Sequence, residues 1–251
     1  MHELTSGTDA ARHDGRRTIV VAIDGPAASG KSSTAQWVAE KLGFRHVDSG
    51  SLYRAVTAAR LRAGGSPDEW SEASVLAVAR QVSLRPTERG FIPLLRGEPA
   101  DGEIRGGEVT REVSRTARML SVRDWVNGEV RRVAAGHDVV VDGRDIGTVV
   151  FPDAQLKIFL VADPWERATR RLVQRLSRRP TDAEIAEETE RLVQRDARDS
   201  MQTVQARDAI LIDTTYLTQA DQVERIVALA KGVETRSRDG QETGDRGTAL
   251  P

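Results

Sequence analysis

The chain of 251 residues contains no cysteine, which excludes disulfide bonds, thiolate metal sites and cysteine nucleophiles. A net charge of −1 gives no overall positive field for nucleic acid. No apolar run approaches the roughly 20 residues of a membrane span, and residues 1–17 lack the apolar core of a signal peptide. We therefore expect a soluble cytoplasmic protein that binds neither nucleic acid nor a membrane.

Lysine and histidine are also scarce. Lysine occurs at only four positions, so the basic residues are almost all arginine. Biased codon usage explains most surface arginines, and arginine richness alone is poor evidence for a phosphate site. The four histidines are too scattered for a metal cluster, and no Ser/His/Asp arrangement is visible.

One stretch near the N-terminus carries a specific motif. Residues 19–23, after Thr18, form a continuous apolar run, typical of a strand buried on both faces of a parallel sheet. G-x-x-x-x-G-K-S follows at 25–32, and a helical pattern runs from Ser32 to Leu42 and ends at Gly43. Strand, loop and helix in this order predict a phosphate-binding loop.

The residue types of this loop match its chemistry. Glycines let backbone N–H groups approach phosphate oxygens, and the helix N-terminus adds positive charge. Lys31 can reach the β- and γ-phosphates, and the Ser32 hydroxyl can ligate Mg²⁺. A glycine-rich turn that binds nothing is the alternative. It is disfavoured because the lysine, the serine, the strand and the helix all agree with a phosphate-binding loop. The residues expected to bind the nucleoside triphosphate are Gly25, Pro26, Ala27, Ala28, Ser29, Gly30, Lys31, Ser32 and Ser33.

The rest of the chain alternates apolar strands and helices, which predicts an α/β fold with a doubly wound, five-stranded parallel sheet. The four further strands are expected at 44–47, 137–142, 156–161 and 209–213. Helices are expected at about 51–63, 68–82, 108–120, 122–135, 164–177, 181–196 and 218–231. A small antiparallel β insertion is expected at 82–95.

The folded unit is expected to span 17–231, between a disordered extension at 1–16 and a disordered tail at 232–251. An arginine-rich pair of helices at about 167–200 is interpreted as a lid that closes over the triphosphate. The alternative is an arginine-rich solvated face. A monomer is the default expectation for this size.

The ends of the parallel strands meet at one rim, where ligands bind. The rim residues are Gly25, Asp48, Asp142 and Asp213. Arg144 follows the third strand and can bind a phosphate in bidentate fashion, while Asp145 can accept a hydrogen bond from a base amino group. A local ion pair in a polar turn is the alternative. Asp48 and Asp142 are candidates to help Ser32 hold Mg²⁺, through water.

A second group of polar residues follows the second strand. Arg54 could reach the phosphate of an acceptor, and Ser49 a base edge. A helix cap with a solvated arginine is the alternative. In the lid, Arg167, Arg170 and Arg171 share one helical face through their spacing. A site of this kind performs phosphoryl transfer by positioning and charge neutralisation.

Several of these segments resemble bacterial cytidylate kinases. They are the loop 24–33, Asp48-Ser49-Gly50 with Tyr53-Arg54, 102–105, Val122-Arg123, 213–215 and, most specifically, the run from Asp142 to Ala154. The similarity covers nearly all of 17–231. It implies a P-loop nucleoside monophosphate kinase that transfers phosphate from ATP, with Mg²⁺, to a small-molecule acceptor, CMP or dCMP.

The resemblance also implies roles for individual residues. Cytosine would be read by Ser49, Arg123 and Asp145. The acceptor phosphate would meet Arg54, Arg144 and Arg195, and Asp199 would hold the sugar hydroxyls. Arg170 would be the lid arginine that bridges toward ATP, so the catalytic group would be Lys31, Arg144, Arg170 and Arg195. The insertion, about 64–122, would enlarge the acceptor side.

One position departs from the family pattern. Gln202 stands where a second phosphate-binding arginine is expected, and a Ser-Pro-Leu segment is missing after it. Loss of a charge-assisted contact weakens acceptor binding or turnover by about 1.5–3 kcal/mol. Arg198 and Arg207 are candidates to replace the missing cation. The acceptor therefore stays open between CMP, dCMP, and a modified cytidylate or other small phosphate ester. A non-catalytic ATP-binding regulatory protein is the remaining alternative, opposed by the intact Lys31, Ser32, Arg54 and Arg144.

Overall fold

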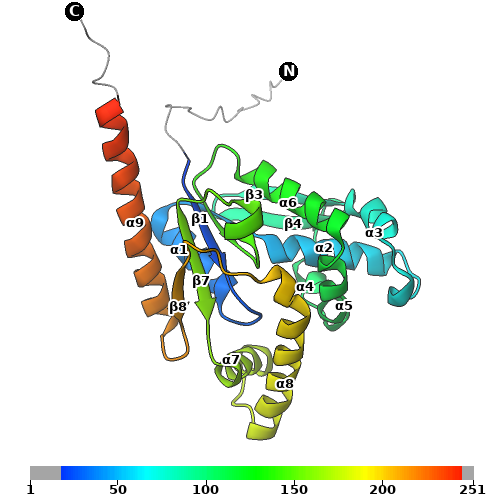
Figure 1. The fold of residues 1–251 in the computed structure, drawn as a ribbon. Coiled ribbons are helices and arrows are strands. Elements are labelled where there is room, and N and C mark those ends of the chain that lie inside the picture. The colour runs from blue at the N-terminus through cyan, green and yellow to red at the C-terminus, as the bar shows by residue number, and fades with distance from the viewer. Residues whose placement is uncertain (1–17, 245–251) are drawn as a thin grey trace, which may run out of the picture.

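A computed structural model describes residues 18–244, which form a central sheet covered by helices on both faces (Figure 1). The predicted extension 1–16 lies outside the described residues. The strands are β1 Val20–Asp24, β2 Arg45–Asp48, β3 Val82–Thr87, β4 Gly90–Leu95, β5 Glu98–Pro99, β6 Val139–Asp142, β7 Leu156–Val161 and β8 Ile210–Asp213.

The α-helices begin and end close to the predicted positions in most cases. They are α1 Lys31–Leu42, α2 Ser49–Arg62, α3 Glu72–Ala79, α4 Asp101–Ile104, α5 Gly107–Ala117, α6 Leu120–Ala134, α7 Pro164–Leu176, α8 Asp182–Asp199 and α9 Gln219–Gly244. Three short turns of other helix types are η1 Pro67–Glu69, η2 Ile146–Val150 and η3 Ser200–Gln202, of which η2 is a π-helix.

The strands form one sheet in the order β3-β4-β2-β6-β1-β7-β8, with β5 beside β4. The pairs among β2, β6, β1, β7 and β8 are all parallel, which confirms the predicted five-stranded parallel core. Register places Asp142 opposite both Ile23 and Asp48. The carboxyl ends of the strands therefore share one rim, as the sequence predicts.

The β insertion continues the main sheet. β3 and β4 form an antiparallel hairpin, and Gly90 pairs in parallel with His46 at the edge of β2. Gly90 has φ +154°, and a Cβ there would lie 2.3 Å from the carbonyl oxygen of His46. Only glycine allows this close approach, so the hairpin joins the sheet where the sequence has no side chain.

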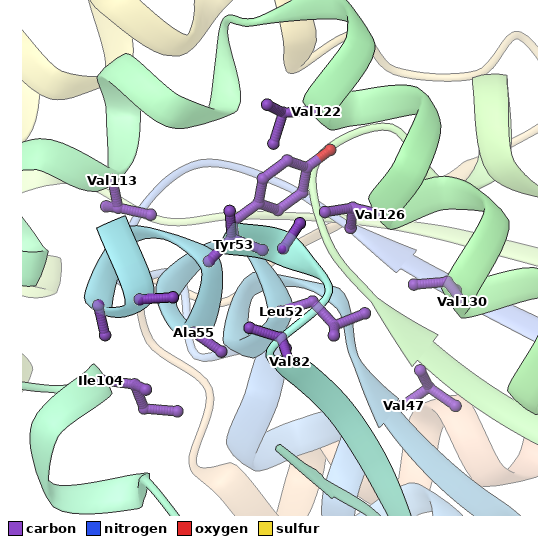
Figure 2. Close-up of a cluster of buried hydrophobic side chains, with 14 of the residues drawn as sticks. Val47, Leu52, Tyr53, Ala55, Val82, Ile104, Val113, Val122, Val126 and Val130 are labelled. Carbon is purple, nitrogen blue, oxygen red and sulfur yellow. The ribbon is translucent and has the colours of Figure 1, made fainter. Parts of the chain in front are cut away.

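Each face of the sheet has its own apolar core, because successive strand residues point to opposite sides. Val21 and Ile23 pack with α1 and α9, whereas Ala22 belongs to the cluster under α2, α3, α5 and α6. Figure 2 shows this second cluster, in which Leu52 and Tyr53 of α2 lie near Val122 and Val126 of α6. Both faces are covered, which explains the uninterrupted apolar runs of the strands.

The α7–α8 pair projects from the sheet near the phosphate-binding loop (Figure 1). Thr181 and Glu184 form a capping box at the start of α8. A small third cluster joins Ala27 of the loop to Ala168, Leu172 and other apolar residues of the two helices. This cluster is separate from the two main cores.

Two segments differ from the prediction. The helix expected over 68–82 is split into η1 and α3, because Ser71 adopts an extended conformation and caps α3. The tail was expected to begin at 232, whereas α9 continues to Gly244. Val233 is buried in the core with α1, so packing extends the helix past the predicted end. Within the described residues, every helix is too short or too polar to cross a membrane.

Candidate active site

The loop between β1 and α1 has the backbone of an anion cradle. Gly25 has φ +147°, and a Cβ there would lie 2.1 Å from the Leu160 carbonyl oxygen. Gly30 is the N-cap of α1 at φ +87°, and because glycine has no side chain, no capping oxygen accepts from the first N–H groups of the helix. Ala28 also has a positive φ, +58°. The loop therefore turns tightly and presents backbone donors at the start of α1.

Lys31 lies buried inside the loop. Its Nζ donates to the carbonyl oxygen of Pro26 at 2.6 Å and lies 3.5 Å from Oγ of Ser29. Burial and the nearby Arg144 guanidinium lower the pKa of Lys31 well below its usual range, although Asp142 and Asp24 oppose this. An anion bound in the loop would offset the positive charge of Arg144 and stabilise the protonated form of Lys31.

Ser32 connects the loop to the end of β6. Its Oγ donates to Oδ2 of Asp142 at 2.5 Å, and Nε2 of His46 lies 2.7 Å from Oδ1 of the same carboxylate. Burial lowers the pKa of His46, but the hydrogen bond and charge of Asp142 outweigh it, and the pKa is raised. Burial and the charge of Asp142 raise the pKa of Asp48. Hydroxyl and carboxylate oxygens are donors that suit Mg²⁺, so these residues fit that ion.

No group of three or more histidine or acidic side chains within the described part of the chain is placed to hold a metal ion by itself. An ion at Ser32 would therefore need most of its oxygens from phosphate and water, which is common for Mg²⁺.

Arg144 joins the loop to the acceptor side. Its Nη1 donates to the carbonyl oxygen of Gly25 at 2.9 Å, and its Nη2 donates to Oδ2 of Asp199 at 3.3 Å. Arg195, one turn before Asp199 on α8, has its Nε 3.5 Å from the same carboxylate oxygen. One carboxylate is thus shared by two guanidinium groups.

The electrostatics of this region favour an anion. Burial, together with the charges of Arg144, Arg54 and Arg171, lowers the pKa of Arg195 to about 10. Burial also lowers the pKa of Arg54, whose Nη1 donates to the Ile104 carbonyl oxygen and to Thr110. The buried Nε of Arg195 has no hydrogen-bond partner among the described residues. The Asp199 carboxylate, 3.5 Å away, pairs with it by charge without a hydrogen bond, so this N–H is available to donate to a bound anion.

The residues expected to read the base lie along the segment that carries Arg144, with Ser49 at Asp142 and Arg123 at Asp145. Asp145 and Arg123 form a buried ion pair, with Arg123 also donating to the Ala117 carbonyl oxygen at 3.0 Å. Burial raises the pKa of Asp145 although Arg123 opposes it. The Ser49 hydroxyl is buried and donates to the Asp142 carbonyl oxygen at 2.8 Å. The arrangement offers both hydrogen-bond acceptors and donors to a small heterocycle.

Asp24 fixes the turn that carries Arg144 and Asp145. Its two carboxylate oxygens accept hydrogen bonds from the N–H groups of Ile146 and Gly147, both at 2.8 Å. Burial raises the pKa of Asp24 to about 6 against the opposing effect of these bonds. The last residue of β1 therefore fixes the π-helix η2. Through this contact, the strand that leads into the phosphate-binding loop also positions the turn that carries Arg144 and Asp145.

The lid arginines are divided between two positions. Arg170 donates to the carbonyl oxygens of Thr214 and Thr215, at 2.6 and 2.9 Å, and so lies at the loop after β8. Arg167 instead reaches the phosphate-binding loop, donating to the Ala27 carbonyl oxygen at 2.7 Å and to Asp196 at 2.6 Å. Asp196 in turn accepts from the Ala27 N–H at 3.0 Å. Although Arg167 and Arg170 share a helical face, they contact different segments: Arg167 contacts the phosphate-binding loop and Arg170 contacts the loop after β8.

The structure thus gathers most of the predicted residues at the rim. Ser33 is exposed. Asp213, at the end of β8, accepts hydrogen bonds from Thr215 and makes none, within the described residues, with the cluster around Asp142. Three residues were missed as site-building groups: Asp24, His46 and Asp196. The signal for Asp24 was a carboxylate at the end of an otherwise apolar run, which requires a polar partner when buried. His46 and Asp196 gave no comparable signal.

A phosphate-binding loop on a doubly wound sheet, facing a cluster of arginines, defines a P-loop phosphotransferase. The sequence model of the family described as cytidylate kinase matches residues 21–232. The chain therefore belongs to the cytidylate kinase family.

Three relatives match this chain over nearly their whole length, at similar levels of sequence identity. The cytidylate kinase of Alkaliphilus oremlandii is 40% identical over 219 residues, covering 86% of this chain and 99% of that protein. The cytidylate kinase of Geobacillus kaustophilus is 42% identical over 221 residues, covering 85% and 97%. That of Streptomyces griseus is 40% identical over 227 residues, covering 86% and 94%.

Proposed function

We propose that the protein transfers the γ-phosphoryl group of ATP to CMP or dCMP, forming ADP and the cytidine or deoxycytidine diphosphate. The observation that carries this proposal is the bond from Arg144 to the Gly25 carbonyl oxygen. It sets the cation for the acceptor phosphate directly against the loop for the donor phosphates. Membership of the cytidylate kinase family supports the choice of acceptor.

On the donor side, the backbone N–H groups of the loop would bind the β- and γ-phosphates together with Lys31. Lys31 would exchange its bond with Pro26 for phosphate oxygens. Ser32, with Asp142 beside it, would hold Mg²⁺. The ion, when bound, neutralises charge on the phosphates.

On the acceptor side, Arg54, Arg144 and Arg195 would hold the monophosphate. Burial, with the charge of Arg144 as a further cause, lowers the pKa of both Arg54 and Arg195, so a bound dianion would relieve the repulsion among these cations. Asp199 already binds two of them and would lie next to the sugar. Opposed phosphates held in this way need little covalent chemistry, because phosphoryl transfer depends on alignment and charge stabilisation.

On the base side, Asp145 would accept a hydrogen bond from the cytosine amino group, with Arg123 and Ser49 completing the contacts. A uracil presents a carbonyl oxygen at that position, which would meet the carboxylate with repulsion. The α7–α8 pair would serve as the lid, and its closure would exclude water from the transfer.

The test is a coupled ADP-release assay with purified protein, ATP and Mg²⁺ across CMP, dCMP, UMP, AMP and GMP. Phosphorylation of CMP or dCMP well above that of the other acceptors is expected. Activity on AMP, UMP or GMP without activity on cytosine nucleotides would refute the base assignment. Lys31→Met serves as the inactive control, because it removes the charge inside the donor loop.

A further inference from the structure

His46 is a largely buried histidine at the rim to which the proposed reaction assigns no role. It lies on β2, and 15% of its side chain is exposed. Its Nε2 lies 2.7 Å from Oδ1 of Asp142, whose side chain is only 3% exposed. An ionised carboxylate can only accept hydrogen bonds, so Nε2 of His46 is the donor whether the imidazole is neutral or charged.

The two oxygens of the Asp142 carboxylate have different partners. Oδ1 accepts from His46, and Oδ2 accepts from Oγ of Ser32 at 2.5 Å. Both distances are in the range of short hydrogen bonds to a charged group. Because a carboxylate is planar, a bond that holds one oxygen also sets the direction of the other. His46 therefore fixes the oxygen that faces the phosphate-binding loop.

These side chains share the face of the sheet that α1 covers. Val140, the register partner of His46, packs in the apolar core with α1. Asp142 is two residues further along β6, so its side chain points to the same face. Ser32 lies in the first turn of α1. Imidazole, carboxylate and hydroxyl thus form one line of hydrogen bonds from β2 through β6 to α1.

The backbone of His46 is held on both of its edges. His46 pairs with Val140 of β6 on one edge and with Gly90 of β4 on the other. Its N–H donates to the Arg89 carbonyl oxygen at 3.1 Å. The imidazole is therefore carried by an inner strand of the sheet, which places a side chain more precisely than a loop does.

The hydroxyl of Ser32 can serve Asp142 and a cation at the same time. It has one proton and two lone pairs. With the proton donated to Asp142, the lone pairs are directed away from that carboxylate and remain available to ligate a cation. Partners that orient the ligands of a metal ion matter for its affinity, and their loss typically lowers that affinity about 10–100-fold.

We propose that His46 is a positioning residue for the divalent cation of the donor site. By holding Oδ1 of Asp142, it keeps Oδ2 on the Ser32 hydroxyl and so directs the lone pairs of that hydroxyl toward the ion. His46 acts through Asp142 and Ser32 and is not itself a ligand. This inference rests on the proposed function, which places Mg²⁺ at Ser32.

The test measures the binding of Mn²⁺ without turnover. Mn²⁺ is titrated into protein saturated with β,γ-imido ATP, a non-hydrolysable analogue, and free Mn²⁺ is followed by electron paramagnetic resonance. His46→Phe keeps a planar ring but has no donor, and it should raise the Kd for Mn²⁺ at least fivefold. The expected factor is modest because phosphate and water supply most of the ligands.

A conservative variant tests whether the donor itself is what matters. His46→Gln carries a side-chain N–H donor at about the same distance from the backbone as Nε2. It should keep the Kd for Mn²⁺ within threefold of the wild type. The Kd for the analogue measured without a metal ion should change less than twofold in both variants, because His46 acts on the cation.

His137→Phe is the matched control. His137 lies just before β6, at the opposite end of the same strand pair, and its Nε2 lies 2.9 Å from Nη1 of Arg45. Loss of this ring should leave the Kd for Mn²⁺ within twofold. In an Asp142→Asn background, His46→Phe should add less than twofold, because His46 acts through Asp142. Thermal unfolding monitors each variant, and His46→Leu replaces His46→Phe if the latter does not fold.

The outcomes separate this inference from the proposed function. A rise of less than fivefold in His46→Phe refutes the role of His46, while CMP phosphorylation by the wild type leaves the proposed function standing. Equal losses in His46→Phe and His46→Gln, or an equal loss of affinity for the metal-free analogue, would make the ring structural and refute the positioning role.

Two results for the wild type are also decisive. If its complex with the analogue binds Mn²⁺ no more tightly than the analogue alone does, the cation site at Ser32 fails, and the role of His46 fails with it. If the wild type phosphorylates no nucleoside monophosphate, the proposed function fails, whereas the Mn²⁺ titrations still decide the role of His46.

Discussion

The guanidinium of Arg144 donates to the carbonyl oxygen of Gly25 at 2.9 Å and to the carboxylate of Asp199 at 3.3 Å. Arg144 follows β6, and Gly25 opens the phosphate-binding loop after β1. Because β1 and β6 are hydrogen-bonded neighbours, this contact requires no bridging element. The side chain expected to hold the acceptor phosphate is therefore fixed against the loop expected to hold the donor.

Arg144→Ala should lower kcat/KM for CMP at least a hundredfold, since it removes a cation at the point where charge develops during transfer. Arg144→Lys keeps the charge but loses the fork that reaches both Gly25 and Asp199, and should be intermediate. Coupled ADP release measures both. Arg85→Ala, at an exposed position of β3, is the control. A loss under threefold for Arg144→Ala would mean that the residue is structural.

Asp145→Asn should change the choice of base. The carboxylate accepts hydrogen bonds only, which suits the amino group of cytosine, whereas the amide of asparagine also donates and can pair with a uracil carbonyl oxygen. The ratio of kcat/KM for CMP to that for UMP should fall at least tenfold, chiefly through a higher KM for CMP. Kinetics with both acceptors measure the ratio.

The partner of Asp145 provides the comparison for that variant. Arg123→Lys keeps the positive charge beside Asp145 and should preserve the preference for CMP better than Asp145→Asn does. An unchanged CMP/UMP ratio in Asp145→Asn would show that another group reads the exocyclic position of the base.

Gly143→Ala should impair acceptor binding. A Cβ at Gly143 would lie 2.5 Å from Oγ of Ser49 and 2.7 Å from Cδ1 of Ile146, so one of the two must move. Ser49 is expected to contact the base, and Ile146 belongs to the turn that carries Arg144 and Asp145. KM for CMP should rise more than fivefold, while KM for ATP should change little. Gly128→Ala, where a Cβ meets nothing within 4 Å, is the matched control.

Local patterns were sufficient to predict the framework of this fold. The apolar run before Gly25 and the helical pattern after it gave β1 and α1 to within about two residues, because each depends on near neighbours. The hairpin was recognised from its turn and apolar strands. Its attachment to β2 was not, since the pairing of Gly90 with His46 joins positions far apart in the chain.

The parts of the candidate site that were not predicted depend on tertiary contacts. Asp24 binds Ile146 and Gly147, more than a hundred residues away, and η2 has no periodic pattern that would reveal a π-helix. The lid arginines were visible, but helical spacing could not show that Arg170 lies at Thr214 whereas Arg167 lies at Ala27. Glu188 resembles its exposed acidic neighbours in the sequence, and only packing buries it.

Asp24 predicts a pH dependence of stability. Burial raises its pKa from 3.8 to about 6 in the folded protein. Between these values the folded state binds more protons at Asp24 than the unfolded chain does, so its contribution to the free energy of unfolding falls as pH rises from about 4 to about 6. At about 1.4 kcal/mol for each pKa unit, the fall is about 3 kcal/mol.

Urea unfolding of wild type and Asp24→Asn from pH 4 to pH 7 isolates this contribution, because the other titrating groups are common to both proteins. The stability of the wild type minus that of Asp24→Asn should decrease across the interval and level off above pH 6.5. Asp101→Asn, at an exposed position of α4, is the control and should give a nearly constant difference. A difference that rises with pH for Asp24→Asn would mean that the hydrogen bonds from Ile146 and Gly147 outweigh burial, which would place the folded-state pKa of Asp24 below its usual value.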